Sequence, residues 1–200
     1  MNTMRDFLFW LTIGFIGMMA LSVVATVHAE ESWFIEPTGS IVWPSNSAIT
    51  YHSMSGTVFY RSGYSVGLDA GRYFGPFKLY ASYTYTSFNA KSVTLQTPYG
   101  PISQSDSDLD HYHSVLLNAD YVWPIVGGWK VLVGGGAGYG FDSTTSPVIE
   151  AHGGVGKDFK WASVYLLCTY RKTYGAITEG HISVERPDEW KPTLILEKRF

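Results

Sequence analysis

The chain has 200 residues, of which 46% are hydrophobic, 16% are aromatic and 16% are charged. Soluble domains carry about 25% charged residues, so this chain is poor in the charge that normally covers an aqueous surface. The net charge of −3 provides no basic surface for a phosphate backbone, and we therefore expect no nucleic-acid partner.

Residues 1–29 have the pattern of a secretory signal peptide. Arg5 precedes an uncharged and mostly apolar run over 7–27, and the segment ends in Val27-His28-Ala29, with small residues where signal peptidase cleaves. We expect cleavage after Ala29, which leaves 30–200 as one domain. The alternative is an uncleaved transmembrane helix, because an apolar run of about 20 residues can span a bilayer.

Beyond residue 30, apolar and polar residues alternate with the period of β-strands that have one apolar face. In one such run, Val115 and Leu117 alternate with Ser114 and Asn118. The pattern predicts eight strands, at 33–43, 57–73, 77–88, 112–122, 130–141, 149–157, 161–171 and 192–200.

The connections between these strands alternate in length. Short connections at 74–76, 123–128 and 158–160 follow the second, fourth and sixth strands, and longer polar connections at 44–56, 90–111, 142–148 and 172–191 follow the others. Short turns at one end and long loops at the other are typical of outer-membrane barrels. The fold class predicted is therefore all-β, an eight-stranded antiparallel up-and-down transmembrane β-barrel.

The aromatic residues provide an independent indication of a membrane protein. One predicted group lies at the short-turn end: Trp33, Tyr73, Phe74, Phe77, Trp123, Trp129, Phe159, Trp161 and Phe200. A second group lies toward the long loops: Tyr60, Tyr85, Phe88, Tyr112, Phe141, Tyr174 and Trp190. Two aromatic bands are expected at the two membrane interfaces. The alternative is a soluble β-sandwich or lipocalin-type barrel, whose apolar faces would point inward.

One stretch of the sequence resembles a known family. LNADYVWP at 117–124, followed by VLVGGGAGYG at 131–140, is similar to the pattern of the outer membrane protein beta-barrel domain family, which includes barrels of the OmpA-transmembrane-domain and OmpX type. Phe200, with Leu196 and Leu194 at alternate positions, resembles a terminal strand recognised by the barrel-assembly machinery, although Lys198 departs from it. The resemblance implies a bacterial outer-membrane location, contact with outer-membrane lipid and lipopolysaccharide, and a monomer.

The strand phase turns a set of ionisable side chains toward the lumen: Glu36, Asp69, Lys78, Asp120, Glu150, His152, Arg171, Glu197 and Arg199. The strand order allows Glu36 to pair with Arg199 across barrel closure, and Glu150 with Arg171. The interior of an eight-stranded barrel is just wide enough for side chains to fill, and charges there must be paired or hydrated. We therefore expect a lumen closed by ion pairs, with a narrow or gated ion path as the alternative.

The function expected is a structural or surface-interaction role through the loops at 44–56, 90–111 and 172–191, with an unknown loop ligand. We expect no enzyme, cofactor or metal site. The enzymatic alternative is a lipid A deacylase, faintly resembled by His181 and Ser183, with Glu179, Glu185 or Glu189 as a third member.

Other motifs point to no chemistry. Asp106, Asp108 and Asp110 lack the later residues of a calcium loop, and the glycine-rich run at 134–140 matches no nucleotide-binding pattern. The single cysteine, Cys168, has no partner for a disulfide.

Overall fold

A computed structural model describes residues 32–52, 54–105, 109–142, 144–179 and 181–200. The predicted signal peptide and its cleavage site lie outside these residues. Within the described ranges, no helix is both long and apolar enough to cross a membrane.

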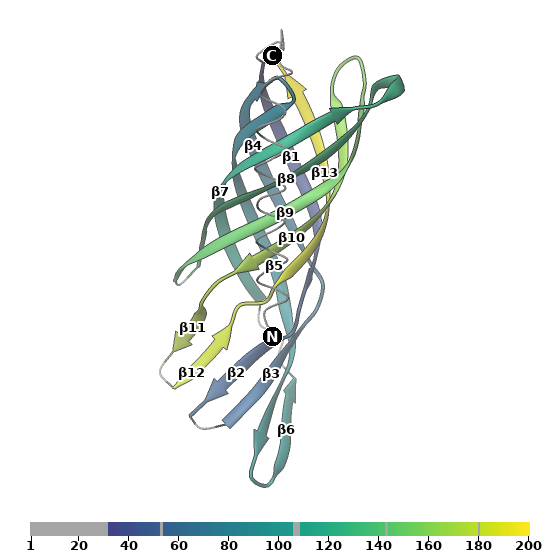
Figure 1. The fold of residues 1–200 in the computed structure, drawn as a ribbon. Coiled ribbons are helices and arrows are strands. Elements are labelled where there is room, and N and C mark those ends of the chain that lie inside the picture. The colour runs from purple at the N-terminus through teal and green to yellow at the C-terminus, as the bar shows by residue number, and fades with distance from the viewer. Residues whose placement is uncertain (1–31, 53, 106–108, 143, 180) are drawn as a thin grey trace, which may run out of the picture.

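Eight antiparallel strands close into a barrel (Figure 1). Each strand pairs with the next, and β1 pairs with both β4 and β13, so the sheet has no free edge within the barrel. This confirms the predicted fold class. In pairing order, the strands are β1 (Trp33–Pro44), β4 (Gly63–Phe74), β5 (Phe77–Thr97), β7 (Leu109–Pro124), β8 (Trp129–Phe141), β9 (Thr145–Asp158), β10 (Ser163–Thr173) and β13 (Glu189–Arg199).

The short turns join β4 to β5, β7 to β8 and β9 to β10, all at the end of the barrel that holds the C-terminus (Figure 1). The β7–β8 turn contains a short 3-10 helix, η2 (Val126–Gly128). Gly127 and Gly128 have φ angles of 72° and 77°, a conformation that favours glycine. We call this end the turn side and the opposite end the loop side.

At the loop side, three of the four long connections form a second sheet, which corrects the prediction of polar loops (Figure 1). Its order is β11-β12-β2-β3-β5-β6, in which β5 is shared with the barrel. We call it the outer sheet. Its other strands are β2 (Ser47–Tyr51), β3 (Met54–Tyr60), β6 (Gly100–Ser105), β11 (Ala176–Glu179) and β12 (Ile182–Glu185). These segments are short and polar on one face, which makes their alternation difficult to recognise in sequence.

The prediction of a single strand at 57–73 is wrong, because the strand is interrupted between the end of β3 at Tyr60 and the start of β4 at Gly63. The backbone N–H of Arg61 donates to the carbonyl of Asn89 at 2.8 Å at this break. Val58, before the break, is buried, whereas Tyr64 and Val66, after it, are about half exposed on the outside of the barrel. The run thus combines two strands whose apolar residues face opposite sides.

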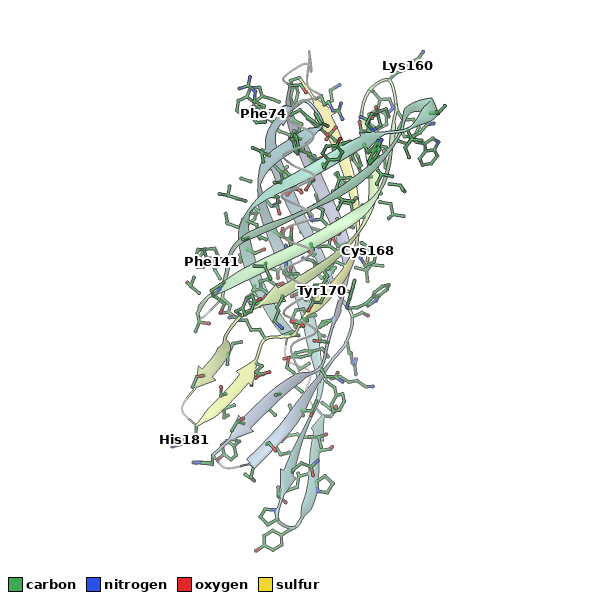
Figure 2. All side chains as sticks on the ribbon, viewed as in Figure 1. Phe74, Phe141, Lys160, Cys168, Tyr170 and His181 are labelled. Atoms are coloured by element: carbon green, nitrogen blue, oxygen red, sulfur yellow. The ribbon has the colours of Figure 1, made fainter. Side chains whose placement is uncertain are left out.

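The barrel strands turn their apolar residues outward, as expected for a barrel in lipid. Leu117 is 74% exposed and Leu166 is 58% exposed, while Ser114 and Asp120 on the alternate phase are buried. Cys168 also lies on the outer face (Figure 2). The interior contains apolar side chains as well as charged ones. The apolar side chains form a cluster of Phe34, Tyr73, Tyr80, Val122, Leu132, Tyr165, Leu167 and Ile195.

The aromatic bands are only partly as predicted. Trp33, Trp123 and Trp161 are exposed at the turn side, and Phe141 and Trp190 are exposed toward the loop side. Phe74 and Phe141 mark the two levels in Figure 2. Four residues assigned to the bands instead turn inward, because they lie on the lumen phase of their strands or at the barrel mouth: Tyr60, Tyr73, Phe88 and Tyr112.

Two glycines of β8 make room for polar side chains of the neighbouring strand β7. Gly134 pairs with Asp120, and Gly136 pairs with Asn118. A Cβ atom would lie 2.0 Å from Asp120 Oδ1 at the first position and 1.8 Å from Asn118 Oδ1 at the second. The glycine run therefore serves lumen packing.

Candidate functional site

The turn-side half of the lumen is filled by an ion-pair network that we call the turn-side cluster: Glu36, Tyr73, Lys78, Glu197 and Arg199. Lys78 Nζ lies 2.5 Å from Glu36 Oε1 and 3.4 Å from Glu197 Oε2, and the side chains of all three residues are fully buried. Arg199 Nε lies 2.6 Å from the other oxygen of Glu197. Tyr73 donates a hydrogen bond to Glu197 Oε2 at 2.5 Å. Two carboxylates and two cations thus neutralise one another.

Aromatic rings surround the cations of this cluster. Lys78 Nζ lies 4.4 Å from the ring centre of Phe34 and 4.9 Å from that of Tyr80. The guanidinium of Arg199 lies 4.3 Å from the ring centre of Tyr73. Cation–π contacts of this kind are strongest where water is excluded. The rings therefore stabilise the ammonium group and fill the space around it.

A second network, the loop-side cluster, consists of Asp120, Glu150, His152 and Arg171. Glu150 Oε2 accepts hydrogen bonds from both Nε and Nη2 of Arg171, at 3.0 and 2.7 Å. His152 Nε2 lies 2.8 Å from Asp120 Oδ1, and its other nitrogen lies 3.9 Å from Glu150. The predicted Glu150–Arg171 pair is therefore present, and His152 links it to the carboxylate of Asp120.

At the barrel mouth, β13 adds two buried charges that the sequence interpretation placed in a loop. Glu189 accepts a hydrogen bond from the Tyr112 hydroxyl, and Lys191 Nζ lies 3.7 Å from the other carboxylate oxygen. Their alternation with the exposed Trp190 continues the phase of β13. That continuation is the signal that would have assigned them to the lumen.

A polar cavity of about 40 Å³ lies among the lumen side chains, between Asp69, Tyr80, His152 and Lys191. Its volume is sufficient for a few water molecules. Asp69 accepts a hydrogen bond from Ser82 at 2.6 Å. Tyr80 links the two clusters, because its hydroxyl donates to Asp120 at 3.3 Å and its ring centre lies 4.9 Å from Lys78 Nζ.

The predicted pairing of Glu36 with Arg199 is wrong. Glu36 contacts Lys78 instead, and Arg199 contacts Glu197 on its own strand. In the strand register, Glu36 lies opposite Asp69 and Lys78 lies opposite Tyr73, and Gly71 stands between these two positions of β4 without a side chain. The hydroxyls of Tyr73 and Tyr80, which donate to Glu197 and Asp120, were not predicted as partners, because the alternation of the strand residues does not distinguish interior rings from interfacial ones.

The candidate catalytic residues lie at the tips of the outer sheet. The His181 ring stacks on His52 with 4.3 Å between ring centres. The Ser183 hydroxyl accepts a hydrogen bond from Thr178 at 3.4 Å. Glu189, one proposed third member, is buried at the barrel mouth. The side chain of His181 thus contacts another histidine, and the hydroxyl of Ser183 is bonded to a threonine.

The described residues contain no group of three or more His, Cys, Asp or Glu side chains placed to hold a metal ion. Asp106 and Asp108, considered for calcium, lie outside the described residues, and of Asp110 only the backbone, in β7, is described.

At the loop side, Arg186 connects the segment between β12 and β13 to the turn between β8 and β9. Its Nη2 atom lies 2.6 Å from Asp142 Oδ2 and donates to Thr144 Oγ1, while its Nε donates to Ser146 at 3.1 Å. Asp142 lies in the turn between β8 and β9, outside the barrel strands. Partial burial raises the pKa of Asp142, but the Thr144 backbone N–H and the Arg186 guanidinium outweigh burial and hold this pKa below its ordinary value.

The chain matches no protein-family model, and no curated protein is similar to it in sequence. Among solved structures, it is similar to neisserial surface protein A (NspA), with a TM-score of 0.53 and 13% identity over 86% of this chain and 100% of that one. It is also similar to the outer membrane protease OmpT from Escherichia coli, with a TM-score of 0.50 and 7% identity over 86% of this chain and 99% of that one. At these identities the likeness concerns the fold alone. The chain therefore has the barrel fold of outer-membrane proteins, a fold shared by a surface protein and a protease.

Proposed function

We propose that this protein is an outer-membrane barrel that does not conduct ions and acts in surface interaction through its outer sheet. The observation that carries the proposal is the assembly of three long connections into one sheet at the loop side, above a lumen filled by two ion-pair clusters. In outer-membrane barrels, the long connections face the cell exterior. The outer sheet is therefore the part of the molecule that a partner outside the cell would meet.

The proposal of a closed lumen rests on the burial and pairing of the charged side chains inside it. Lys78, Glu36 and Glu197 are fully buried, and each belongs to an ion pair. An ion entering the lumen would have to break such a pair, and a buried charge that loses its partner is strongly destabilising. This argument favours a plug over a gated path.

The outer sheet has features of an interaction surface. In the described part of the chain, β6 pairs only with β5 and β11 only with β12, so each leaves one edge of backbone groups open. Near the β6 edge, Tyr99 is fully exposed and Ile102 is 61% exposed. Open edges and exposed apolar side chains are the usual means by which a sheet engages another chain.

The remaining partners follow from the outer face of the barrel and from the C-terminus. Outer-membrane lipid and lipopolysaccharide would contact the exposed apolar belt. The barrel-assembly machinery would bind the terminal strand at Phe200, which is 71% exposed and whose backbone N–H donates to the carbonyl of Trp33 at 3.0 Å. The closed ladder within the barrel supports a monomer. We propose no catalytic role, because His181 and Ser183 contact other residues than each other.

The test is photo-crosslinking on intact cells with a crosslinking amino acid at Ile102. A matched control carries the same amino acid at Leu194, which is 57% exposed on the barrel wall. We expect discrete protein adducts at Ile102 and none at Leu194, because only the outer sheet faces protein partners. Equal adduct patterns at the two positions, or none at Ile102, would overturn a surface-interaction role for this sheet.

A further inference from the structure

A cavity of about 390 Å³ lies between the outer sheet and the mouth of the barrel. Apolar residues of the outer sheet and of the barrel strands line it. They include Ile49, Val58, Ile177, Val184, Phe88 and Tyr112.

The outer sheet turns apolar residues toward this cavity. β2, β3, β11 and β12 each place an apolar residue on the same face, while Thr50 on the alternate phase is exposed. That face covers an open volume. Ligand sites are commonly concave and mostly apolar, with volumes of about 300–1,000 Å³ and a few polar groups that orient the ligand.

The polar groups of the cavity are predominantly acidic. Glu185 and Glu189 line it together with a single cation, Arg186, and the guanidinium of Arg186 is already bound to Asp142 at 2.6 Å. The cavity thus has two carboxylates and no cation free to meet an anionic ligand.

Glu189 is buried, and one of its two carboxylate oxygens has no hydrogen bond within the part of the chain that the structure describes. Its Oε1 atom accepts a hydrogen bond from Tyr112, whereas Oε2 has no hydrogen-bond partner among the described residues. Lys191 Nζ is 3.7 Å from Oε2, too far for a hydrogen bond, and it lines the lower polar cavity. Buried carboxylate oxygens normally have a partner, so this one points to a donor that the protein itself does not supply.

We propose that this cavity binds a small amphiphilic amine. The apolar body of the amine contacts the inner face of the outer sheet, and its ammonium group donates a hydrogen bond to Glu189 Oε2. The charge-assisted bond satisfies the open oxygen, and the two carboxylates disfavour an anionic ligand of the same shape.

The test is a titration of the full chain in zwitterionic lipid nanodiscs, followed by methyl NMR of Ile49 and Ile177. The probes are 2-phenylethylamine, the neutral 2-phenylethanol and the anionic 3-phenylpropionate, which share an apolar ring. We expect saturable shifts at both methyl groups with the amine, about tenfold weaker binding of the alcohol and no saturable binding of the acid. Methyl groups of Val131 and Val133 on the barrel wall report any partition into lipid.

Three variants separate the contact from the cavity. Glu189→Gln removes the charge and is expected to weaken amine binding about tenfold. Ile177→Trp fills the cavity while leaving Glu189 in place, and is expected to abolish the saturable shifts. Asp158→Asn removes a carboxylate at the turn side and is expected to leave binding unchanged.

The proposal is overturned if the amine causes no saturable shift in the wild-type chain, if the acid binds as tightly as the amine, or if Ile177→Trp binds as the wild type does. Unchanged affinity in Glu189→Gln would overturn the contact with Oε2. Retention of the wild-type methyl spectrum outside the cavity shows that each variant is folded.

Discussion

Lys78 is the residue on which the turn-side cluster depends, because its single ammonium group lies beside two buried carboxylates. Glu36 and Glu197 both lose their contact with Nζ if the lysine is removed. Arg199 would still contact Glu197, but Glu36 would face the lumen without a cation. A buried charge without a partner costs several kcal/mol.

We therefore expect Lys78→Met to lower the free energy of unfolding by about 3–5 kcal/mol. Urea unfolding in lipid vesicles, followed by tryptophan fluorescence, measures the change. The double variant Lys78→Met/Glu36→Gln should recover part of the loss, because it removes the unpaired charge together with its partner. Lys160, exposed in the β9–β10 turn (Figure 2), provides a matched control, and Lys160→Met should change stability by less than about 0.5 kcal/mol.

A loss in Lys78→Met no larger than that in Lys160→Met would contradict the account of the cluster. At this scale, the sequence predicts which side chains face the lumen, because alternation alone assigns Lys78 and Asp120 to the interior. The choice of partner could not be predicted. It depends on the reach of side chains across the barrel, because Glu36 and Lys78 lie on β1 and β5, which β4 separates in the sheet.

Among the elements, the outer sheet is the feature that sequence patterns did not reveal. β11 and β12 have only four residues each, too few for alternation to be distinguished from a polar loop. The pairing of β12 with β2 is between segments far apart in the chain. The long barrel strands, in contrast, repeat the pattern for a full membrane span, and their existence was predicted correctly.

The connection between β12 and β13 is held to the β8–β9 turn by Arg186 and Asp142. Because the pKa of Asp142 is held below its ordinary value, the contact is complete above the ordinary pKa of about 3.9 and is lost as the pH falls through the lower value of the folded protein. We expect Arg186→Ala to raise the pKa of Asp142 toward its ordinary value. NMR titration of the Asp142 side-chain carboxyl carbon measures this change.

Arg61→Ala is the control for this titration, since it removes the same charge from an exposed position near the loop side. It should leave the Asp142 midpoint where the wild type has it. Identical midpoints in wild type and Arg186→Ala would contradict the role assigned to this ion pair.

For the whole molecule, the closed barrel accounts for the unusual composition. The scarcity of charge reflects an outer face of exposed apolar residues such as Leu117 and Leu194, and much of the remaining charge is buried inside. Strand number, strand order and the separation of short turns from long connections could be predicted, because lipid imposes one repeating pattern on every strand. The outer sheet and the cavity beneath it could not, since neither is constrained by the membrane.

The central claim is a barrel whose lumen is closed by paired charges, and single-channel recording in a planar bilayer tests it most directly. The folded full chain should insert without steady conductance above leak, because both ion-pair clusters block the path. Steady unitary currents from the wild-type chain, abolished by Lys78→Met or Arg171→Met, would show a conducting lumen and contradict the account.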